Sequence, residues 1–378
     1  MMQSMPDHSP RKILLLARGG SLDGAQRQTL YLALQLPRLG YTPHLLLNAD
    51  GPMRDHLHAA NIPNTVLPMR GWRTLRGFLC RPFDLPRLRQ CAASINPALI
   101  HACDIYKVRY ALALARRLRC PTIAHVRGPV TPRDLTKHAV TRTDAVIAIA
   151  SRYATAMQRA GLAANRLHVI DDAVDFDRFT PAARADSSFR REYNLHDTLA
   201  VGIVGRVEPF KKIREFAQLA QLTIQQNARA KFFVIGETAD ADYHRSVLHA
   251  IPDAHARQNL IFTGRRDDMP NVLAGLDVLV TLSGGSVMFE AQAVGTPVLS
   301  ISHAGQFSDH TRHNETALCL HTTDMHAAAD CLLQLLADPA RRAALAACAQ
   351  THVQAQLSIT AMVQKTVRVY DALLSPAR

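Results

Sequence analysis

Short uninterrupted apolar segments alternate along the chain with longer segments in which apolar residues recur every three or four positions. Apolar runs without polar alternation are typical of strands buried on both faces of a parallel sheet, and the longer segments are typical of the helices that cover it. In the N-terminal half, the pattern predicts strands at 13–17, 43–47, 65–67, 99–100, 122–126, 145–149 and 167–170.

The alternation then begins again, with predicted strands at 199–204, 231–235, 260–262, 278–282 and 297–301. At 378 residues the chain is too long for one core, because single cores stop growing at about 250–300 residues. We expect an α/β protein of two doubly wound, Rossmann-like parallel-sheet domains that face each other across a cleft. We place them at 1–180 and 198–355, with a polar linker at 181–197 and a C-terminal helix at 356–378 that packs back on the N-terminal domain.

Composition changes this picture in two ways. The chain has 44 Lys and Arg against 31 Asp and Glu, a net charge of +13, which favours a polyanionic partner: nucleic acid, an anionic membrane or a phosphorylated substrate. Its seven cysteines are odd in number and never form C-x-x-C, which argues against a disulfide framework and for a reducing compartment. No apolar run is long enough to span a bilayer, so we expect a cytoplasmic protein.

In open parallel sheets, ligands bind beyond the carboxyl ends of the strands, so the loops that directly follow strands are the candidate sites. The loop after 199–204 carries Arg206 and Lys211, five residues apart, a planar fork and a point charge that suit a diphosphate. Taken alone, such a loop is more often a solvated basic turn. The loop after the first strand contains Gly20 and is interpreted either as ligand-facing or as an ordinary turn.

A glycine-rich loop follows the predicted strand 278–282 and leads into a helix. Backbone N–H groups of Gly285, Ser286 and Val287 can bind an anion there. Glu290, one turn later, can hold the two hydroxyls of a ribose, or it can simply interact favourably with the helix dipole.

His125 and Arg127 lie at the end of the predicted strand 122–126. A lone histidine on an apolar strand is more often a satisfied core residue, but at a cleft edge beside an arginine it becomes a candidate for substrate contact. Two D-x-D triplets, at 175–177 and 240–242, are typical of turns and helix caps, so we expect no metal site.

The segment 70–83 interleaves the only tryptophan of the chain with arginines. This mixture suits an anionic membrane surface, where arginines meet headgroups and aromatic rings enter the interface. The residues expected to touch the membrane are Arg70, Trp72, Arg73, Arg76 and Phe78. A basic helix whose aromatic side chains face the core, and a surface that stacks on nucleic-acid bases, remain open as alternatives.

Taken together, these segments resemble the GT-B glycosyltransferases of family 4 over nearly the whole chain. The resemblance rests on 24–27 with 39–41, on 169–175 followed by Phe179 and Pro181, on Arg206 with Lys211, on 262–264, and on Glu290 with 295–298. Within it, Asp172 and Ala173 replace an Asn and a Gly of the family pattern, and 126–127 are inserted before Gly128.

The resemblance implies retaining transfer of a sugar from a UDP- or GDP-linked donor to a hydroxyl of a glycan or lipid-linked acceptor, with no metal or other cofactor. It implies a role in bacterial cell-surface polysaccharide or lipopolysaccharide assembly, at the inner face of the cell membrane, and nucleic acid is then not an expected partner. The N-terminal domain is expected to bind acceptor, through Arg127 and His101, and the C-terminal domain to bind donor. Donor contacts are assigned to Gly20, Arg206, Lys211, Gly264, Gly285, Ser286, Val287 and Glu290, and catalysis to His125, Arg206 and Lys211.

One departure from the family pattern bears on activity. The family has two glutamates separated by seven residues; Glu290 matches the second, whereas the first falls on Leu282. This departure is consistent with a GT-B scaffold that binds nucleotide-sugar but is catalytically impaired. A nucleotide-sugar epimerase is a related alternative, and a nucleic-acid-binding protein is a third, which rests on the net charge of +13.

Overall fold

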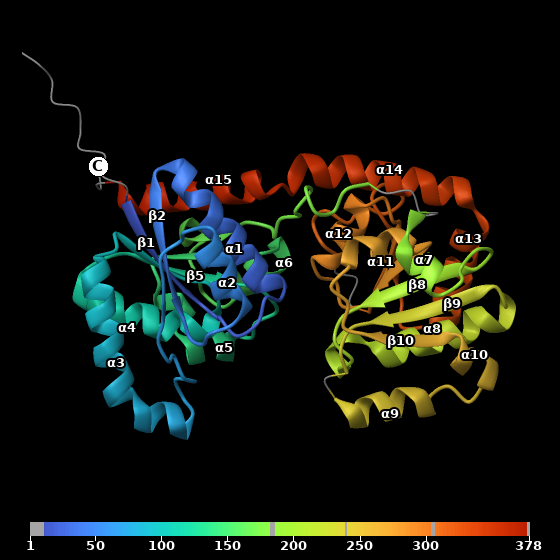
Figure 1. Cartoon of the computed structure of the whole chain (residues 1–378), viewed down its shortest axis with the longest axis horizontal. Helices are drawn as coiled ribbons and strands as arrows, with labels where there is room; N and C mark the ends of the chain where they lie inside the picture. The colour runs from blue at the N-terminus through green and yellow to red at the C-terminus, as the bar shows by residue number, and fades with distance from the viewer. Residues whose placement is uncertain (1–10, 182–185, 239, 304–306, 376–378) are drawn as a thin grey trace, which may run out of the picture. The chain divides into compact units, whose positions relative to one another are not determined.

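The computed structural model describes residues 11–181, 186–238, 240–303 and 307–375. The chain forms two compact units, shown in Figure 1: the first comprises Met1–Ala173 with Ile359–Arg378, and the second comprises Val174–Ser358. Each unit is a parallel sheet with helices on both faces, so the prediction of two parallel-sheet α/β domains is confirmed.

The first unit holds a seven-stranded parallel sheet in the order β3-β2-β1-β4-β5-β6-β7. Its strands are β1 (Arg11–Ala17), β2 (Tyr41–Leu47), β3 (Asn64–Val66), β4 (Leu99–Ala102), β5 (Thr122–Val126), β6 (Ala145–Ala148) and β7 (Leu167–Val169). The helices are α1 (Gly24–Gln35), α2 (Pro52–Ala59), α3 (Leu75–Ile95), α4 (Val108–Leu118), α5 (Pro132–His138), α6 (Ser151–Arg159) and α15 (Ile359–Leu374).

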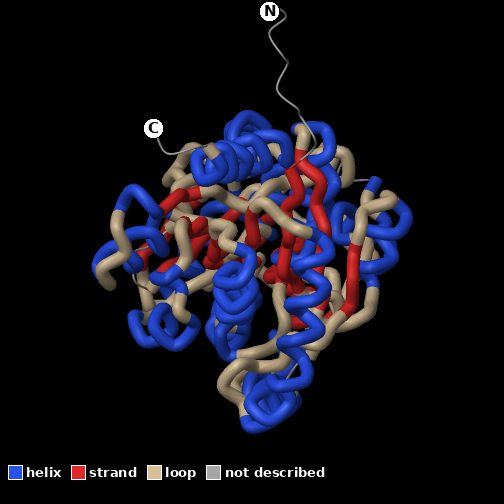
Figure 2. Tube along the Cα trace, turned by 90° about the vertical axis from the view of Figure 1, so that its left-hand side faces the viewer, coloured by secondary structure: helices blue, strands red, loops and turns tan. Residues whose placement is uncertain are grey.

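Strand β1 shows why the sequence lacks alternation. Ile13 and Leu15 belong to one buried cluster, whereas Leu14 and Leu16 belong to another, so successive side chains enter cores on opposite faces of the sheet. The backbone trace in Figure 2 shows strands inside, with helices around them. Both faces exclude water over residues 13–17, so these positions must be apolar, whereas Arg11 and Lys12 at the start of the strand are exposed.

The final helix, α15, belongs to the first unit. Its Tyr370 has no exposed surface, and the tyrosine hydroxyl lies 2.7 Å from Nδ1 of His101 on β4. The Tyr370 ring also meets the ring of Tyr41 edge to face, with centroids 5.8 Å apart. The last helix thus closes one face of a sheet that the beginning of the chain builds.

The second unit holds a six-stranded parallel sheet in the order β10-β9-β8-β11-β12-β13. Its strands are β8 (Leu199–Val204), β9 (Ala230–Ile235), β10 (Leu260–Gly264), β11 (Val278–Thr281), β12 (Val298–Ser302) and β13 (Leu318–His321). The helices are α7 (Ser188–Glu192), α8 (Ile213–Gln226), α9 (Ala241–His249), α10 (Ala254–Gln258), α11 (Met269–Gly275), α12 (Val287–Ala293), α13 (Met325–Ala337) and α14 (Pro339–Gln356).

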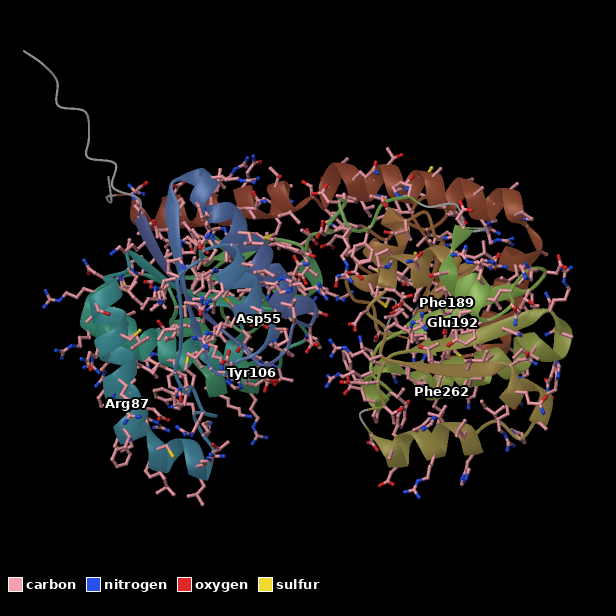
Figure 3. All side chains as sticks on the ribbon, viewed as in Figure 1. Asp55, Arg87, Tyr106, Phe189, Glu192 and Phe262 are labelled. Atoms are coloured by element: carbon pink, nitrogen blue, oxygen red, sulfur yellow. The ribbon has the colours of Figure 1, made fainter. Side chains whose placement is uncertain are left out.

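The segment 181–197, expected to be a linker, differs from that expectation where it is described. Residues 188–192 form α7, and Phe189 is fully buried inside the second unit, 4.9 Å from the Phe233 ring (Figure 3). Arg190 donates to the buried carboxylate of Asp277 across 3.1 Å. An aromatic anchor and a charge pair hold this polar stretch against the second sheet; residues 182–185 lie outside the described chain.

Candidate functional site

Three neighbouring strands of the second unit end in glycines that let their loops pack closely. Gly205 N–H donates to the carbonyl of Ile235 across 2.9 Å, and Gly236 N–H donates to the carbonyl of Gly264 across 3.0 Å. Gly236 has φ of +155°, and a Cβ there would lie 2.1 Å from the carbonyl oxygen of Gly205. Backbones meet here without side chains between them, which fixes the start of the loop that carries Arg206 and Lys211.

That loop concentrates positive charge at the end of β8. The Arg206 guanidinium pairs with Glu208 at 3.1 Å and remains 60% exposed. Lys211 ends a short 3₁₀ turn, η6 (Pro209–Lys211), and its stem packs beside Gly205. Burial lowers the pKa of the Lys211 ammonium; Glu208 opposes this shift and Arg206 adds to it. Two cations share one carboxylate, so the loop is suited to an anion.

The loop before α12 leaves the same edge of the sheet, because β11 pairs directly with β8. Gly284 and Gly285 have φ of +68° and +120°, and the helical hydrogen bonds begin only with Met288 N–H to the carbonyl of Gly285. The N–H groups of residues 285–287 therefore precede the helical ladder. Glu290 lies in the first turn of the helix, as the sequence predicts.

Leu282 stands where the family pattern has its first glutamate, and the structure buries it. The side chain is 8% exposed and belongs to a core cluster that includes Val280 and Leu299. No carboxylate is available at this position, and a side chain here packs rather than contacting a ligand.

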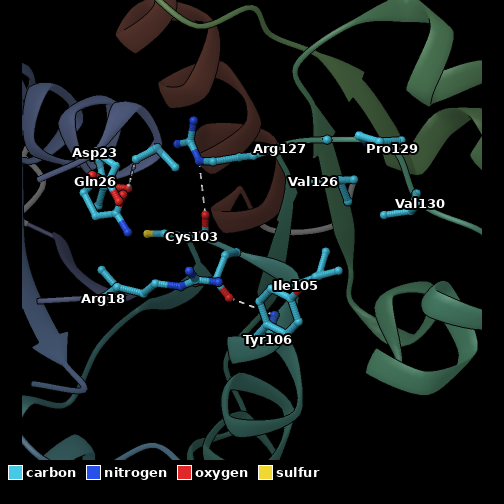
Figure 4. Close-up of a pocket in the computed structure, with 15 residues that line it drawn as sticks. Arg18, Asp23, Gln26, Cys103, Ile105, Tyr106, Val126, Arg127, Pro129 and Val130 are labelled. Atoms are coloured by element: carbon cyan, nitrogen blue, oxygen red, sulfur yellow. Dashed lines mark hydrogen bonds and ion pairs between the residues drawn. The ribbon is translucent and has the colours of Figure 1, made fainter. Parts of the chain in front are cut away.

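The first unit carries a pocket of about 320 Å³ at the carboxyl ends of β1, β4 and β5 (Figure 4). We call it the acceptor pocket, after the role expected of this unit from the sequence. Its polar lining comes from Arg18, Asp23, Gln26, Asp104, Tyr106 and Arg127. Among these, only Arg127 was assigned a role of its own from the sequence.

Arg127 is held in place from three directions. Its guanidinium donates to the Asp172 carboxylate at 2.6 Å and to the Cys103 carbonyl at 3.2 Å, the latter drawn in Figure 4. A third contact joins it to Nδ1 of His125 at 3.4 Å. Arg127 is thus a rigid cation in the wall of the pocket.

The opposite wall is built by Arg18, Asp104 and Tyr106. Arg18 donates to the Asp104 carboxylate across 3.2 Å and lies 5.1 Å from the centre of the Tyr106 ring. Asp104 also caps the short turn η2 (Ile105–Lys107) through the Tyr106 N–H at 2.8 Å. The available signal was their position just after β1 and β4, where ligands bind in such sheets.

His101 and His125 are buried instead of lining the pocket. They are 0% and 3% exposed, and their rings stack with centroids 5.4 Å apart. Burial, with Arg127 adding to it, lowers the pKa of His101 to about 3, and burial, Arg127 and His101 together hold that of His125 well below 6.5. Both rings are therefore neutral near pH 7. His101 has no surface for an acceptor to contact, and His125 reaches the pocket only through Arg127.

The remaining candidate residues are divided between surface and interior. Gly20 is exposed in the loop after β1, two residues from Arg18. Arg73, Arg76 and Phe78 are exposed, but Arg70 pairs with Asp84, which is only 5% exposed. A buried carboxylate needs a counter-charge, which draws Arg70 inward.

Trp72 is also turned toward the protein. Its ring is partly buried, 4.9 Å from the Tyr110 ring, with the Arg81 guanidinium 4.4 Å from its centre. Exposed apolar side chains follow it on α3: Leu75, Phe78, Leu79 and Phe83 are 76%, 64%, 61% and 70% exposed. Apolar exposure is thus concentrated on α3 and not at the tryptophan.

The two D-x-D triplets have structural roles. Asp240 caps α9 by accepting from the Tyr243 N–H at 2.9 Å, and Asp175 accepts from the Arg178 N–H at 3.3 Å. Across the described ranges, no cluster of three or more His, Cys, Asp or Glu side chains has a metal-binding arrangement. None of the helices in the described chain combines the length and apolar character needed to cross a bilayer.

Comparison with known families covers both units. Residues 22–178 match the model of glycosyltransferase family 4, and residues 186–352 match that of glycosyl transferases group 1. The chain is 29% identical over 218 residues to a GDP-mannose-dependent monoacylated alpha-(1-6)-phosphatidylinositol monomannoside mannosyltransferase of Corynebacterium glutamicum, covering 54% of this chain and 55% of that protein. It is 28% identical over 144 residues to the UDP-Gal:alpha-D-GlcNAc-diphosphoundecaprenol alpha-1,3-galactosyltransferase of Escherichia coli, covering 35% and 36%. The chain thus spans only about half, or less, of the length of these relatives.

Solved structures agree over nearly the whole chain. Anabaena HepE, determined with UDP and glucose, superposes with a TM-score of 0.81 at 21% identity, covering 96% of this chain and all of that one. Sucrose-phosphate synthase from Thermosynechococcus elongatus gives 0.78 at 18% identity, covering 97% and 100%. With both units matched by glycosyltransferase models and the fold shared with such structures, the chain belongs to the GT-B glycosyltransferases of family 4.

Proposed function

We propose that the protein transfers a hexosyl group from a UDP- or GDP-sugar to a hydroxyl of a glycan or lipid-linked acceptor, with retention of anomeric configuration. The reaction would serve assembly of bacterial cell-surface polysaccharide or lipopolysaccharide. One observation carries the proposal: the Arg206–Lys211 loop presents two cations at the end of β8, on the strand that pairs with β11, whose loop leads into Glu290.

The chemistry follows from where charge develops. Negative charge grows on the nucleoside diphosphate as the glycosidic bond breaks, and Arg206 and Lys211 stabilise it electrostatically. Because burial lowers the pKa of Lys211, its ammonium acts in a medium where each charge interaction is stronger than in water. Two cations supply the charge neutralisation that a divalent ion would otherwise give, and Glu290 holds the ribose.

The acceptor pocket of the first unit takes the second substrate. In a retaining reaction at one face of the sugar, the departing phosphate itself accepts the proton of the acceptor hydroxyl, so no separate base is required. His125 then acts as a positioning residue, because its Nδ1 contacts Arg127 and its ring is buried. Arg18 and Arg127 hold the acceptor in place.

Two observations favour a lipid-linked acceptor at a membrane. The mannosyltransferase and galactosyltransferase relatives are named for phosphatidylinositol and diphosphoundecaprenol acceptors. In addition, α3 exposes Leu75, Phe78 and Phe83 among arginines, the composition of a surface that lies on anionic lipid. We therefore place the protein peripherally on the inner face of the cell membrane.

Thermal unfolding in the presence of UDP, GDP and their sugar conjugates tests the donor assignment. A ligand that binds only the folded state raises the unfolding temperature, by about 2.7 kcal/mol of stabilisation at a hundredfold excess over Kd. We expect one of the two nucleotides to raise Tm and Lys211→Ala to abolish the rise. If no nucleotide changes Tm and none of the sugars is transferred, the proposal fails. The anomeric configuration of the product, read by NMR, decides retention.

A further inference from the structure

A second pocket, of about 750 Å³, adjoins the acceptor pocket on the first unit. The segment before α3, helix α4 and helix α5 line it, and we call it the arginine groove. It is lined chiefly by Trp72, Arg73, Arg109, Arg133, Lys137 and His138. Tyr106, labelled in Figure 3, lines both pockets, and its ring lies 5.0 Å from the His138 ring, so the two pockets share this side chain as a wall.

The arginine groove carries positive charge with little to neutralise it. Arg109 donates to the Lys137 carbonyl at 2.7 Å, which is a contact with backbone and not with a carboxylate. Burial, followed by the charges of Arg73, Arg142 and Arg81, lowers the pKa of Arg109. Within the described ranges, the Arg73, Arg133 and Lys137 side chains form no ion pair.

The single acid of the groove is already engaged. The carboxylate of Asp134 accepts from the Thr131 hydroxyl at 2.6 Å and from the Thr131 N–H at 3.1 Å, which closes the capping box at the start of α5. These donors are neutral, so Asp134 keeps its charge and offsets the positive charge of the groove only in part. The arginines and Lys137 outnumber this one carboxylate, and an anion with several oxygens would relieve the remaining repulsion through forked guanidinium contacts.

Beyond the arginine groove the surface becomes apolar. A shallower pocket of about 670 Å³ shares Trp72, Arg73 and Arg109 with the groove and extends to Phe78 and Arg81. These last two also line a pocket of about 450 Å³ whose other walls include Leu79, Pro82, Leu85 and Pro86 of α3. From the acceptor pocket outward, the order is thus polar, cationic and apolar.

We propose that the arginine groove binds the diphosphate of a lipid-linked acceptor, with the acceptor glycan in the acceptor pocket and the hydrocarbon chain along α3. The proposal rests on the proposed function, because it takes the acceptor pocket to hold the acceptor. The polarity order matches such a molecule: glycan hydroxyls, then a compact polyanion, then an alkyl chain. Arginine favours the diphosphate because its planar fork matches phosphate oxygens. The hydrocarbon chain of the lipid would cover the exposed apolar side chains of α3.

Trp72 makes the proposal directly measurable. It is the only tryptophan of the protein and lines the arginine groove, so its fluorescence reports on occupation of this site. We would titrate the full-length chain with farnesyl diphosphate, inorganic pyrophosphate and farnesol. Farnesyl diphosphate should change the emission saturably and bind at least about tenfold more tightly than pyrophosphate, since ~1.4 kcal/mol from burying part of the alkyl chain suffices.

Two variants separate the parts of the site. Arg73→Glu/Lys137→Glu reverses two exposed charges and should weaken farnesyl diphosphate at least about tenfold. Phe78→Ser/Leu79→Ser should remove the preference over pyrophosphate while pyrophosphate binding persists. Arg159→Glu, an exposed charge reversal on α6 outside the groove, is the matched control and should bind like the wild type. Circular dichroism and Tm establish that each variant is folded.

Failure of this proposal is distinguishable from failure of the proposed function. If pyrophosphate binds as tightly as farnesyl diphosphate, if the double charge reversal binds normally, or if UDP or GDP displaces the lipid probe, the lipid-diphosphate site is overturned. Nucleotide binding measured by Tm on the same variants should remain intact when the groove is altered. If the variants change farnesyl diphosphate binding as expected but the protein binds no nucleotide, the arginine groove is supported and the proposed transferase function fails.

Discussion

The guanidinium of Arg127 donates a 2.6 Å hydrogen bond to the carboxylate of Asp172. In the family resemblance drawn from the sequence, both residues depart from the shared pattern: Arg127 falls in an insertion, and Asp172 stands in place of an asparagine. Their side chains are 10% and 16% exposed. The two departures therefore compensate each other, because the added carboxylate neutralises the added guanidinium beside the acceptor pocket.

Asp172→Asn tests that pairing. The change leaves a nearly buried guanidinium without its counter-charge, and we expect the free energy of unfolding to fall by on the order of 1–3 kcal/mol. Urea unfolding measures it. Asp50→Asn removes the partner of Arg54 in a surface pair whose side chains are 64% and 39% exposed, and should cost less than about 1 kcal/mol. Equal losses in both variants would show that the Arg127–Asp172 pair contributes no more than a surface pair.

Stability should fall as the solution becomes acidic, in part through His101. Its folded-state pKa is about 3, below the ordinary 6.5, so below pH 6.5 the unfolded chain takes up a proton that the folded chain does not. The unfolding free energy should then decrease by up to about 1.4 kcal/mol per pH unit for this group, until pH approaches 3. Thermal unfolding of His101→Gln between pH 7 and 4 should show a shallower decline than the wild type. His58→Gln, on the surface of α2, should decline like the wild type; a parallel decline in both variants would contradict the assignment.

Lys211→Ala should lower turnover by about 10²-fold or more, as loss of one donor to a developing anion does. Steady-state kinetics with the donor identified by thermal shift measures it. Lys212→Ala is the neighbouring control, because Lys212 pairs with Glu215 at 3.2 Å on the adjoining helix and should leave turnover near that of the wild type. Near-normal turnover in Lys211→Ala would remove this residue from the mechanism.

Gly236→Ala should disrupt the loop that presents Lys211. The added Cβ meets the Gly205 carbonyl oxygen at 2.1 Å, in a backbone conformation of φ +155°, so the cost should be on the order of 1–3 kcal/mol with loss of nucleotide binding. Gly161→Ala is the control that introduces backbone strain without a steric clash, because Gly161 has φ of +90° and open space around the position of the added Cβ. Nucleotide binding by Gly236→Ala at wild-type strength would refute the argument.

Leu75→Ser/Phe83→Ser should weaken adsorption to vesicles that contain phosphatidylglycerol. Both side chains are largely exposed on α3, so the Tm of the variant should hardly change. Each substitution removes apolar contact with lipid that is worth about 1.5–3 kcal/mol of binding free energy if the side chain is fully buried there. Vesicle sedimentation at low salt measures the loss. Binding of the wild type to neutral vesicles as strong as to anionic ones would count against a role for the arginines.

The sequence by itself determined the layers of this protein and one of its loops. Uninterrupted apolar runs specify β1 because both faces of the sheet exclude water, and the same argument predicts β8 and β11. The loop that contains Arg206 and Lys211 was predictable because it directly follows a strand, where parallel sheets present their ligand-binding loops.

Only the tertiary structure decided the environment of each side chain. His101 and His125 look like ligand-facing residues until Tyr370, 269 positions after His101, closes over the first of them. The acceptor pocket likewise needs Arg18 and Asp104, whose 3.2 Å contact joins residues 86 positions apart. Local periodicity reports whether a segment is buried, but burial and pKa of one side chain depend on neighbours that distant parts of the chain bring to it.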